Sequence, residues 1–183
     1  MLKECLWIPV LKTERLILRK LTLSDADDLR EWLGLDIVYK YWSRAASKGE
    51  KNPELLFVDS RPNVKRKPSH DFIWGIEYEN KVIDIIEVFD VENDRLGKIG
   101  YRINPKHWNK GICSEALNCV VRFVFTETSL DRLETTVDVN NIGSNSVLKK
   151  CGFIHEGSIR PGKFGSRYCD YNIYGLIKDD FAC

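Results

Sequence analysis

Residues 103–125, INPKHWNKGICSEALNCVVRFVF, decide the fold of this chain, because an alternating run gives way here to a helical pattern across a short polar corner. Pro105 cannot donate a hydrogen bond to a sheet, so the strand that reaches Ile103 ends there. Asn109 and Gly111 are the residue types that enter the left-handed backbone region most readily. The pattern therefore predicts a strand, a tight turn and a helix in succession.

The corner between this strand and this helix has the features of an anion site. The first N–H groups of a helix lack intrahelical partners, and the helix dipole adds positive potential. Lys110 adds a charge, and we expect Ser114 to cap the helix with Glu115 in its first turn. An ordinary strand-to-helix connection has the same composition, so these residues alone leave both interpretations open.

A second segment favours a phosphate cradle. Residues 137–153 read VDVNNIGSNSVLKKCGF, a strand followed by a helix that Gly152 ends. This segment resembles the motif Asn-x-x-Ser-x-x-Val-Leu-x-Lys-x-Gly-Phe of the GNAT superfamily of N-acetyltransferases. The matching residues are Asn141, Ser144, Val147, Leu148, Lys150, Gly152 and Phe153.

The corner itself resembles the cofactor loop of that superfamily, Gln/Arg-x-x-Gly-x-Gly/Ala. Lys106 stands at the first position and Asn109 at the first glycine, and both depart from the pattern. Because Asn109 tolerates the same backbone conformation as glycine, we expect a working cradle. The resemblance to the ribosomal-protein N-acetyltransferase branch spans nearly the whole chain and is carried by residues 13–19, 100–105 and 168–176.

The resemblance implies a fold and a cosubstrate. The fold is α/β (α+β), the GNAT fold, with a mixed, mostly antiparallel central sheet of about six or seven strands flanked by helices. In it the strands that end near Ile103 and Val139 splay apart and hold the pantetheine arm of acetyl-coenzyme A. The residues expected to bind this cosubstrate are Ile103, Asn109, Lys110, Gly111, Ile112, Cys113, Ser114, Asn141, Asn145 and Lys150.

The reaction that the resemblance implies is transfer of an acetyl group to a primary amine, either a protein N-terminal α-amine or a small amine. By resemblance, Asn141 positions the cosubstrate and Ser144 donates to the departing sulfur, although a plain N-cap and a first-turn serine are open alternatives. No residue stands out as the base; Glu87 is our candidate and Glu77 a second, and either could simply be solvated. An α-amine with a pKa near 7.8 is about one-seventh neutral at pH 7, whereas fewer than about one lysine in a thousand is neutral. An α-amine acceptor therefore needs a weaker base than a lysine side chain would need.

Functions from other classes are also considered. A non-catalytic coenzyme A-binding sensor or interaction module on the same fold is the alternative. A nucleotide-binding protein is disfavoured, because the chain contains neither GxxxxGK[ST] nor GxGxxG after the first strand. A formal net charge of +1 argues against a general nucleic-acid binder. The basic residues 61–67 form either a solvated loop or a flap that meets an acidic substrate or a cofactor phosphate.

Size and composition indicate one globular domain, residues 1–183, with 43% hydrophobic and 30% charged residues. The 6 cysteines show no CxxC or metal-ligand spacing, so we expect free thiols, no metal and a cytoplasmic location. The first residues show no signal-peptide pattern, and no long apolar run predicts a membrane span. The aromatic-rich last strand is expected to lie either in the core or at a dimer edge.

The remaining elements follow from local patterns. We expect a helix capped by Ser24 and ended by Gly34, then a short helix over residues 38–42. The expected strands are residues 16–18, 72–76, 81–89, 98–103, 133–139, 153–156 and 168–177, with Gly162, Lys163 and Gly165 in the loop before the last.

Overall fold

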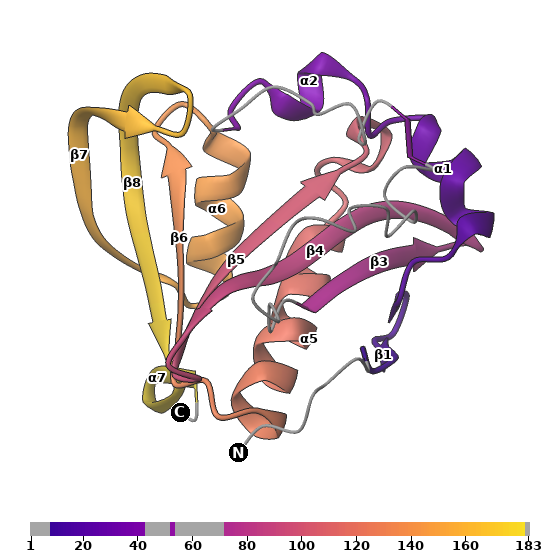
Figure 1. Cartoon of the computed structure of the whole chain (residues 1–183), viewed down its shortest axis with the longest axis horizontal. Helices are drawn as coiled ribbons and strands as arrows, with labels where there is room; N and C mark the ends of the chain where they lie inside the picture. The colour runs from indigo at the N-terminus through magenta and orange to yellow at the C-terminus, as the bar shows by residue number, and fades with distance from the viewer. Residues whose placement is uncertain (1–7, 43–51, 54–71, 182–183) are drawn as a thin grey trace, which may run out of the picture.

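The structure is a computed structural model that describes residues 8–42, 52–53 and 72–181. Its centre is an 8-stranded sheet in the order β1-β2-β3-β4-β5-β6-β8-β7 (Figure 1). The strands are β1 (Leu11–Lys12), β2 (Ile17–Arg19), β3 (Phe72–Tyr78), β4 (Lys81–Glu92), β5 (Leu96–Ile103), β6 (Arg132–Asp138), β7 (Ile154–Phe164) and β8 (Arg167–Ile177). Every neighbouring pair is antiparallel except β5 and β6. The predicted mixed, mostly antiparallel sheet is confirmed.

Helices cover the sheet. They are α1 (Ala26–Arg30), α2 (Asp36–Tyr39), α5 (Ile112–Glu127), α6 (Ile142–Lys150) and α7 (Lys178–Phe181), with short 3₁₀ turns η1 (Leu23–Asp25) and η2 (Pro105–His107). In the view of Figure 1, α5 and α6 lie behind the sheet, and α1 and α2 lie along its upper edge. The positions at helical spacing in α5, namely Leu117, Val120, Val121 and Val124, are fully buried, as their spacing predicts.

The sheet separates two hydrophobic cores. On the α5 side, Ile86 and Val88 of β4 pack in one cluster with Ile99 of β5. On the other side, Val82 and Ile85 of β4 pack with the residues of α1, α2 and the turn between them, including Leu29, Trp32, Leu33, Val38 and Tyr39. Because successive strand residues point to opposite faces, β4 contributes to both cores.

Two turns have the backbone that their residues favour. Glu79 and Asn80 join β3 to β4 with φ of 51° and 62°, as in a two-residue type I′ hairpin. Asn93 and Asp94, with φ of 50° and 57°, join β4 to β5. These turns deliver β5 into the corner that begins at Asn104.

Some expected boundaries are wrong. The first helix does not begin at Ser24, because Thr22 caps the 3₁₀ turn η1, and the second runs over Asp36–Tyr39 rather than residues 38–42. Gly162 and Lys163 lie within β7, paired with Cys169 and Tyr168, rather than in a loop. The register shifts between Ile159 and Gly162, which lets the strand continue past Pro161.

Other expectations concern the chain ends and loops. The last strand, β8, pairs with β6 on one side and β7 on the other, so it is an internal strand and not an exposed edge. The two-residue β1 is the strand that the sequence did not predict. No helix among the described residues is long and apolar enough to cross a membrane. The basic residues 61–67 lie outside the described residues.

Candidate active site

The break between β5 and β6 is the central feature of the site. These parallel strands pair only where Leu96, Gly97 and Lys98 face residues 132–134. Beyond that point β5 stays paired with β4, and β6 with β8, while the two strands diverge from each other (Figure 1). The N–H of Asn104 donates to the carbonyl of Ile83 on β4 at 3.0 Å. Because a trans peptide points its two polar groups in opposite directions, the carbonyl of Ile103 faces the gap.

The corner after β5 has the backbone geometry that was predicted for an anion cradle. Asn109 and Gly111 both adopt the left-handed backbone conformation, with φ of 60° and 75°, and flank Lys110. Gly111 is the N-cap of α5, and no side chain caps the helix there. The N–H groups of Ile112 and Cys113 in the first turn lack intrahelical partners, so the corner can donate to a diphosphate.

The expected cap at Ser114 is wrong. The left-handed Gly111 starts the helix at Ile112, which places Ser114 inside the first turn. The carbonyl of Ser114 instead accepts a bond from the thiol of Cys151 at 3.5 Å. Glu115 lies in the first turn, as expected.

Arg15, from the segment before β2, contacts the cradle, and the sequence did not reveal this contact. Arg15 donates through Nε to Glu115 Oε2 at 2.8 Å and through Nη1 to the carbonyl of Lys110 at 3.3 Å. Partial burial favours a higher pKa for Glu115, but hydrogen bonds from Thr13 and Arg15 hold that pKa below its ordinary value. Glu115 is therefore a carboxylate beside an anion site, and Arg15 neutralises it.

Tyr101 is a second residue that the sequence did not single out. Its hydroxyl lies 2.8 Å from Ser144 Oγ, across the gap between β5 and α6. Asn141 caps α6, and its side chain accepts a bond from the N–H of Ser144 at 3.2 Å. Burial raises the pKa of Tyr101 well above its ordinary value, so its hydroxyl stays protonated. Because residues two apart on a strand lie on the same face, the predicted role of Ile103 could have placed Tyr101 on the face that meets α6.

Asn145 and Lys150, which were also predicted to bind the cosubstrate, are placed differently from Ser144. Asn145 is buried, its Nδ2 donates to the carbonyls of Asp138 at 3.1 Å and Asn141 at 2.8 Å, and its Oδ1 accepts from Asn172 and Tyr174. Its amide therefore holds the loop between β6 and α6. Lys150 is the last residue of α6, about 12 Å along the helix axis from the first at 1.5 Å per residue.

The two candidate bases differ in their surroundings. Glu87 accepts a bond from Arg102 Nη2 at 3.2 Å, and the guanidinium of Arg102 lies 4.8 Å from the ring centre of Trp42. Glu77 is paired with Arg19 at 2.7 Å on the β2–β3 side of the sheet. Of the two, Glu87 is the one beside β5, where the strands diverge.

Asp84 is an unexpected buried acid. It lies opposite Ile103, is 0% exposed, and neither carboxyl oxygen has a hydrogen-bond partner among the described residues. Burial raises its pKa well above the ordinary value, against weaker opposing contributions from the Ile85 N–H and from Arg102. Burial therefore favours the neutral form of the Asp84 carboxyl beneath the corner.

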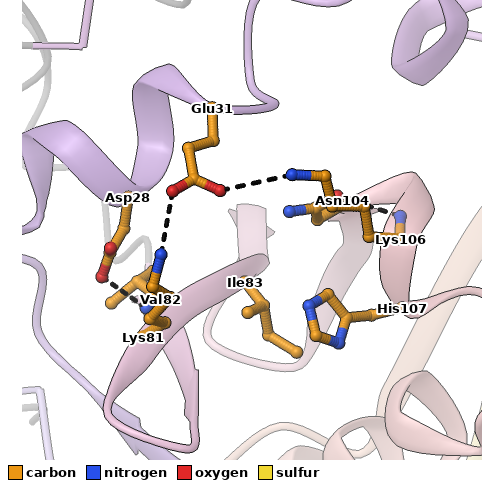
Figure 2. A pocket seen from close by; sticks show the side chains of 8 residues that line it. All are labelled: Asp28, Glu31, Lys81, Val82, Ile83, Asn104, Lys106 and His107. Atoms are coloured by element: carbon orange, nitrogen blue, oxygen red, sulfur yellow. Dashed lines mark hydrogen bonds and ion pairs between the residues drawn. The ribbon is translucent and has the colours of Figure 1, made fainter.

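A cavity of about 210 Å³ lies beside the corner, between α1, the start of β4 and η2 (Figure 2). Glu31 bridges Lys81 at 2.9 Å and Lys106 at 3.6 Å, and Asp28 accepts a bond from the Val82 N–H at 2.9 Å. Lys106, which occupies the first position of the resembled loop motif, thus points its ammonium at Glu31. Burial lowers the pKa of His107, so this wall of the cavity adds no full charge.

The described residues contain no group of three or more metal-ligating side chains in one place. Together, the diverging strands, the uncapped helix start and the hydroxyl pair define a transferase that holds an acyl thioester of coenzyme A between two strands.

Comparisons with known proteins identify the family. A family model described as Acetyltransferase (GNAT) domain matches residues 15–154. Uncharacterized N-acetyltransferase YoaA of Bacillus subtilis is 31% identical over 175 residues, which cover 93% of this chain and 97% of the relative. The ribosomal-protein-serine acetyltransferase of Escherichia coli is 31% identical over 103 residues, 55% of this chain and 58% of that protein. A crystal structure of a GNAT-family acetyltransferase from Bacillus anthracis superposes with a TM-score of 0.78 at 25% identity, covering 93% of this chain and 99% of that one.

The chain therefore belongs to the GNAT acetyltransferase family, and it is an acetyl-coenzyme A-dependent N-acetyltransferase. The predicted fold and enzyme class are confirmed. The matched relatives carry the names of enzymes, so the comparisons give no support to the non-catalytic alternative.

Proposed function

We propose that this enzyme acetylates a primary amine, either the α-amine of a protein N-terminus or a small amine, by direct attack of the amine on the thioester. The observation that carries the proposal is the Tyr101–Ser144 hydroxyl pair at the gap between β5 and α6. A site of this kind needs a proton donor where the sulfur departs and an acceptor for the proton of the amine.

Ser144 is the proposed donor. In the transfer, a C–N bond forms, the C–S bond breaks, and the departing sulfur gains a proton. The phenol of Tyr101 stays protonated and can donate to Ser144 Oγ, which turns the serine O–H toward the gap. Asn141 fixes the backbone of Ser144 at the start of α6, so the hydroxyl is held in place before the thioester arrives.

Glu87 is the proposed acceptor for the proton of the amine. Tyr101 and Arg102 are neighbours in β5 and point to opposite faces, so Glu87, which is paired with Arg102, faces away from Ser144. The amine then approaches from the α2 side. The ion pair with Arg102 holds the side chain of Glu87 on that side, and a carboxylate is a weak base. An α-amine, about one-seventh neutral at pH 7, fits such a base better than a lysine.

A thiol-release assay over N-terminal peptides, polyamines and aminoglycosides tests the acceptor class. The decisive pair of substrates is one peptide with a free α-amine and an acetylated lysine, and the same peptide blocked at its N-terminus with a free lysine. We expect release only with the free α-amine. Turnover of the lysine peptide alone would contradict the proposal. The Escherichia coli relative, by its name, acts on a ribosomal protein, which is in keeping with a protein acceptor.

Substitution of Ser144 tests the donor. We expect Ser144→Ala to lower kcat by about 10²-fold or more, the range of a lost general acid, and Tyr101→Phe to lower it by about 2- to 13-fold, the worth of one hydrogen bond. Ser146→Ala, on the same helix but off the gap, is the matched control and should retain activity. Equal activity in Ser144→Ala and Ser146→Ala would remove Ser144 from the mechanism.

The cytoplasmic location stays a prediction. It is supported by the four cysteines that the structure describes, Cys113, Cys119, Cys151 and Cys169, which are all free thiols.

A further inference from the structure

The indole of Trp108 is an apolar surface where the gap between β5 and β6 meets the anion cradle. The residue is 44% exposed, and Asn109, which follows it, begins the left-handed turn of the cradle. Trp108 Nε1 donates to the carbonyl of Ile103, the last residue of β5, at 3.1 Å. The indole is therefore tied to the end of the strand on one side and joined to the cradle on the other.

That hydrogen bond decides what the end of β5 presents to the gap. The carbonyl of Ile103 faces the gap, because the N–H of Asn104 on the same peptide donates to β4. Since this carbonyl accepts a bond from the indole, an apolar ring stands beside it at the entrance to the gap. The bond also limits the rotation of the ring, so the ring is held at that entrance.

We propose that Trp108 is a binding residue for the pantetheine arm of coenzyme A and packs against the first carbons of that arm. This inference rests on the cofactor site of the proposed function and names one contact in it. When the diphosphate lies on the N–H groups of Ile112 and Cys113, the arm has to pass the end of β5 to enter the gap. It therefore passes the indole that is bonded there.

The chemistry of the arm suits this contact. The arm begins, next to the diphosphate, with a CH₂ group and a carbon that carries two methyl groups, and its two amides follow only further along. These first carbons are the part of the arm with no polar group to satisfy. Contact with an indole removes apolar surface of both partners from water, which favours binding.

The cavity beside the corner is a poorer match to that segment. Most of the side chains that line it are polar or charged, and Glu31 bridges Lys81 and Lys106 across it (Figure 2). Methyl groups placed there would separate charged groups from water or from each other, which is unfavourable. The exposed face of Trp108 carries no such cost.

Calorimetric titration of the wild type and of Trp108→Ala with three ligands tests the proposal. Coenzyme A has the whole arm, 4′-phosphopantetheine keeps the arm and one phosphate, and ADP keeps the adenosine and the diphosphate but has no arm. We expect Trp108→Ala to weaken binding of the first two ligands by about 4- to 15-fold, which corresponds to the burial of one or two methyl groups, and to leave ADP binding unchanged. A coenzyme A analogue with hydrogen in place of both methyl groups should bind the variant and the wild type alike.

Two results overturn the proposal. Equal weakening of ADP would mean that the ring shapes the cradle rather than contacts the arm, and unchanged binding of all three ligands would mean that it contacts no part of the cosubstrate. Ile177→Ala is the control, because Ile177 is 39% exposed and pairs with Arg132, which faces Leu96 at the other end of β5. It should bind every ligand as the wild type does. Because no acceptor is present, a failed amine-transfer assay would not affect this result.

Discussion

Replacing Asp84 with asparagine should raise the stability of the enzyme at neutral pH by an amount that grows with pH. Asp84 is fully buried, its oxygens lack partners among the described residues, and burial raises its pKa well above the ordinary value. In the unfolded chain the same carboxyl titrates near its ordinary pKa of about 3.9. The folded protein therefore keeps a proton that the unfolded chain releases.

The sign and size of the effect follow from that difference. A folded-state pKa above the unfolded value gives stability that is fully present below about pH 3.9 and is lost as the pH rises through the folded pKa. Between these limits the free energy of unfolding falls by about 1.4 kcal/mol per pH unit. Asparagine has the same shape and no proton to release, so Asp84→Asn removes this slope. The difference between variant and wild type should widen by that amount with each pH unit until the folded pKa is reached.

Urea unfolding of both proteins at about pH 5, 6 and 7 measures the difference. Comparing the two proteins at each pH cancels carboxylates with the opposite behaviour, such as Glu115, whose pKa lies below its ordinary value. Glu127→Gln, an exposed site on α5, is the control and should show a constant difference. A constant difference for Asp84→Asn would show that folding does not raise the pKa of Asp84, and a variant less stable than the wild type at pH 7 would contradict the expected gain.

Three further substitutions probe the corner and its support. Arg15→Ala leaves the Glu115 carboxylate beside the cradle without its partner, so coenzyme A should bind about three- to tenfold more weakly in a titration, and Glu115→Gln in the same protein should restore binding. Gly111→Ala forces a side chain to a φ of 75° at about 1–2 kcal/mol, which should lower the Tm by about 2–8 °C, whereas Gly143→Ala within α6 should not. Asn145→Ala leaves its buried partners unsatisfied and should cost at least about 2 kcal/mol in urea unfolding, without a change in m.

The corner could be predicted from the sequence because its causes are local. Pro105 ends the strand, and Asn109 and Gly111 adopt the left-handed conformation that their residue types tolerate. The same local reasoning failed at Ser114, because a serine in the first turn looks like a cap until the conformation of Gly111 is known. The strand alternation and the buried stripe of α5 were likewise local patterns, and they were predicted correctly.

The contacts that complete the site join distant parts of the chain, and no local pattern contains them. Arg15 and Glu115 are 100 residues apart, and Tyr101 and Ser144 are 43 apart. Asp84 and Glu87 look alike in the sequence, as acids in an apolar strand. The register of β4 against its neighbours, with a shift between Ile76 and Glu77 on β3, decides that one is buried without a partner and the other is paired.

The two halves of the proposed reaction lie on opposite faces of one strand. In β5, Tyr101 faces α6 and holds Ser144, while its neighbour Arg102 faces Trp42 and holds Glu87. A donor to the departing sulfur and an acceptor for the proton of the attacking amine serve two atoms that are bonded to the same carbonyl carbon during the reaction. Because β5 is unpaired on the side of β6 beyond Lys98, groups on its two faces can approach such a carbon from opposite sides. In the proposed reaction the cosubstrate lies on the α5–α6 side and the acceptor approaches from the α2 side.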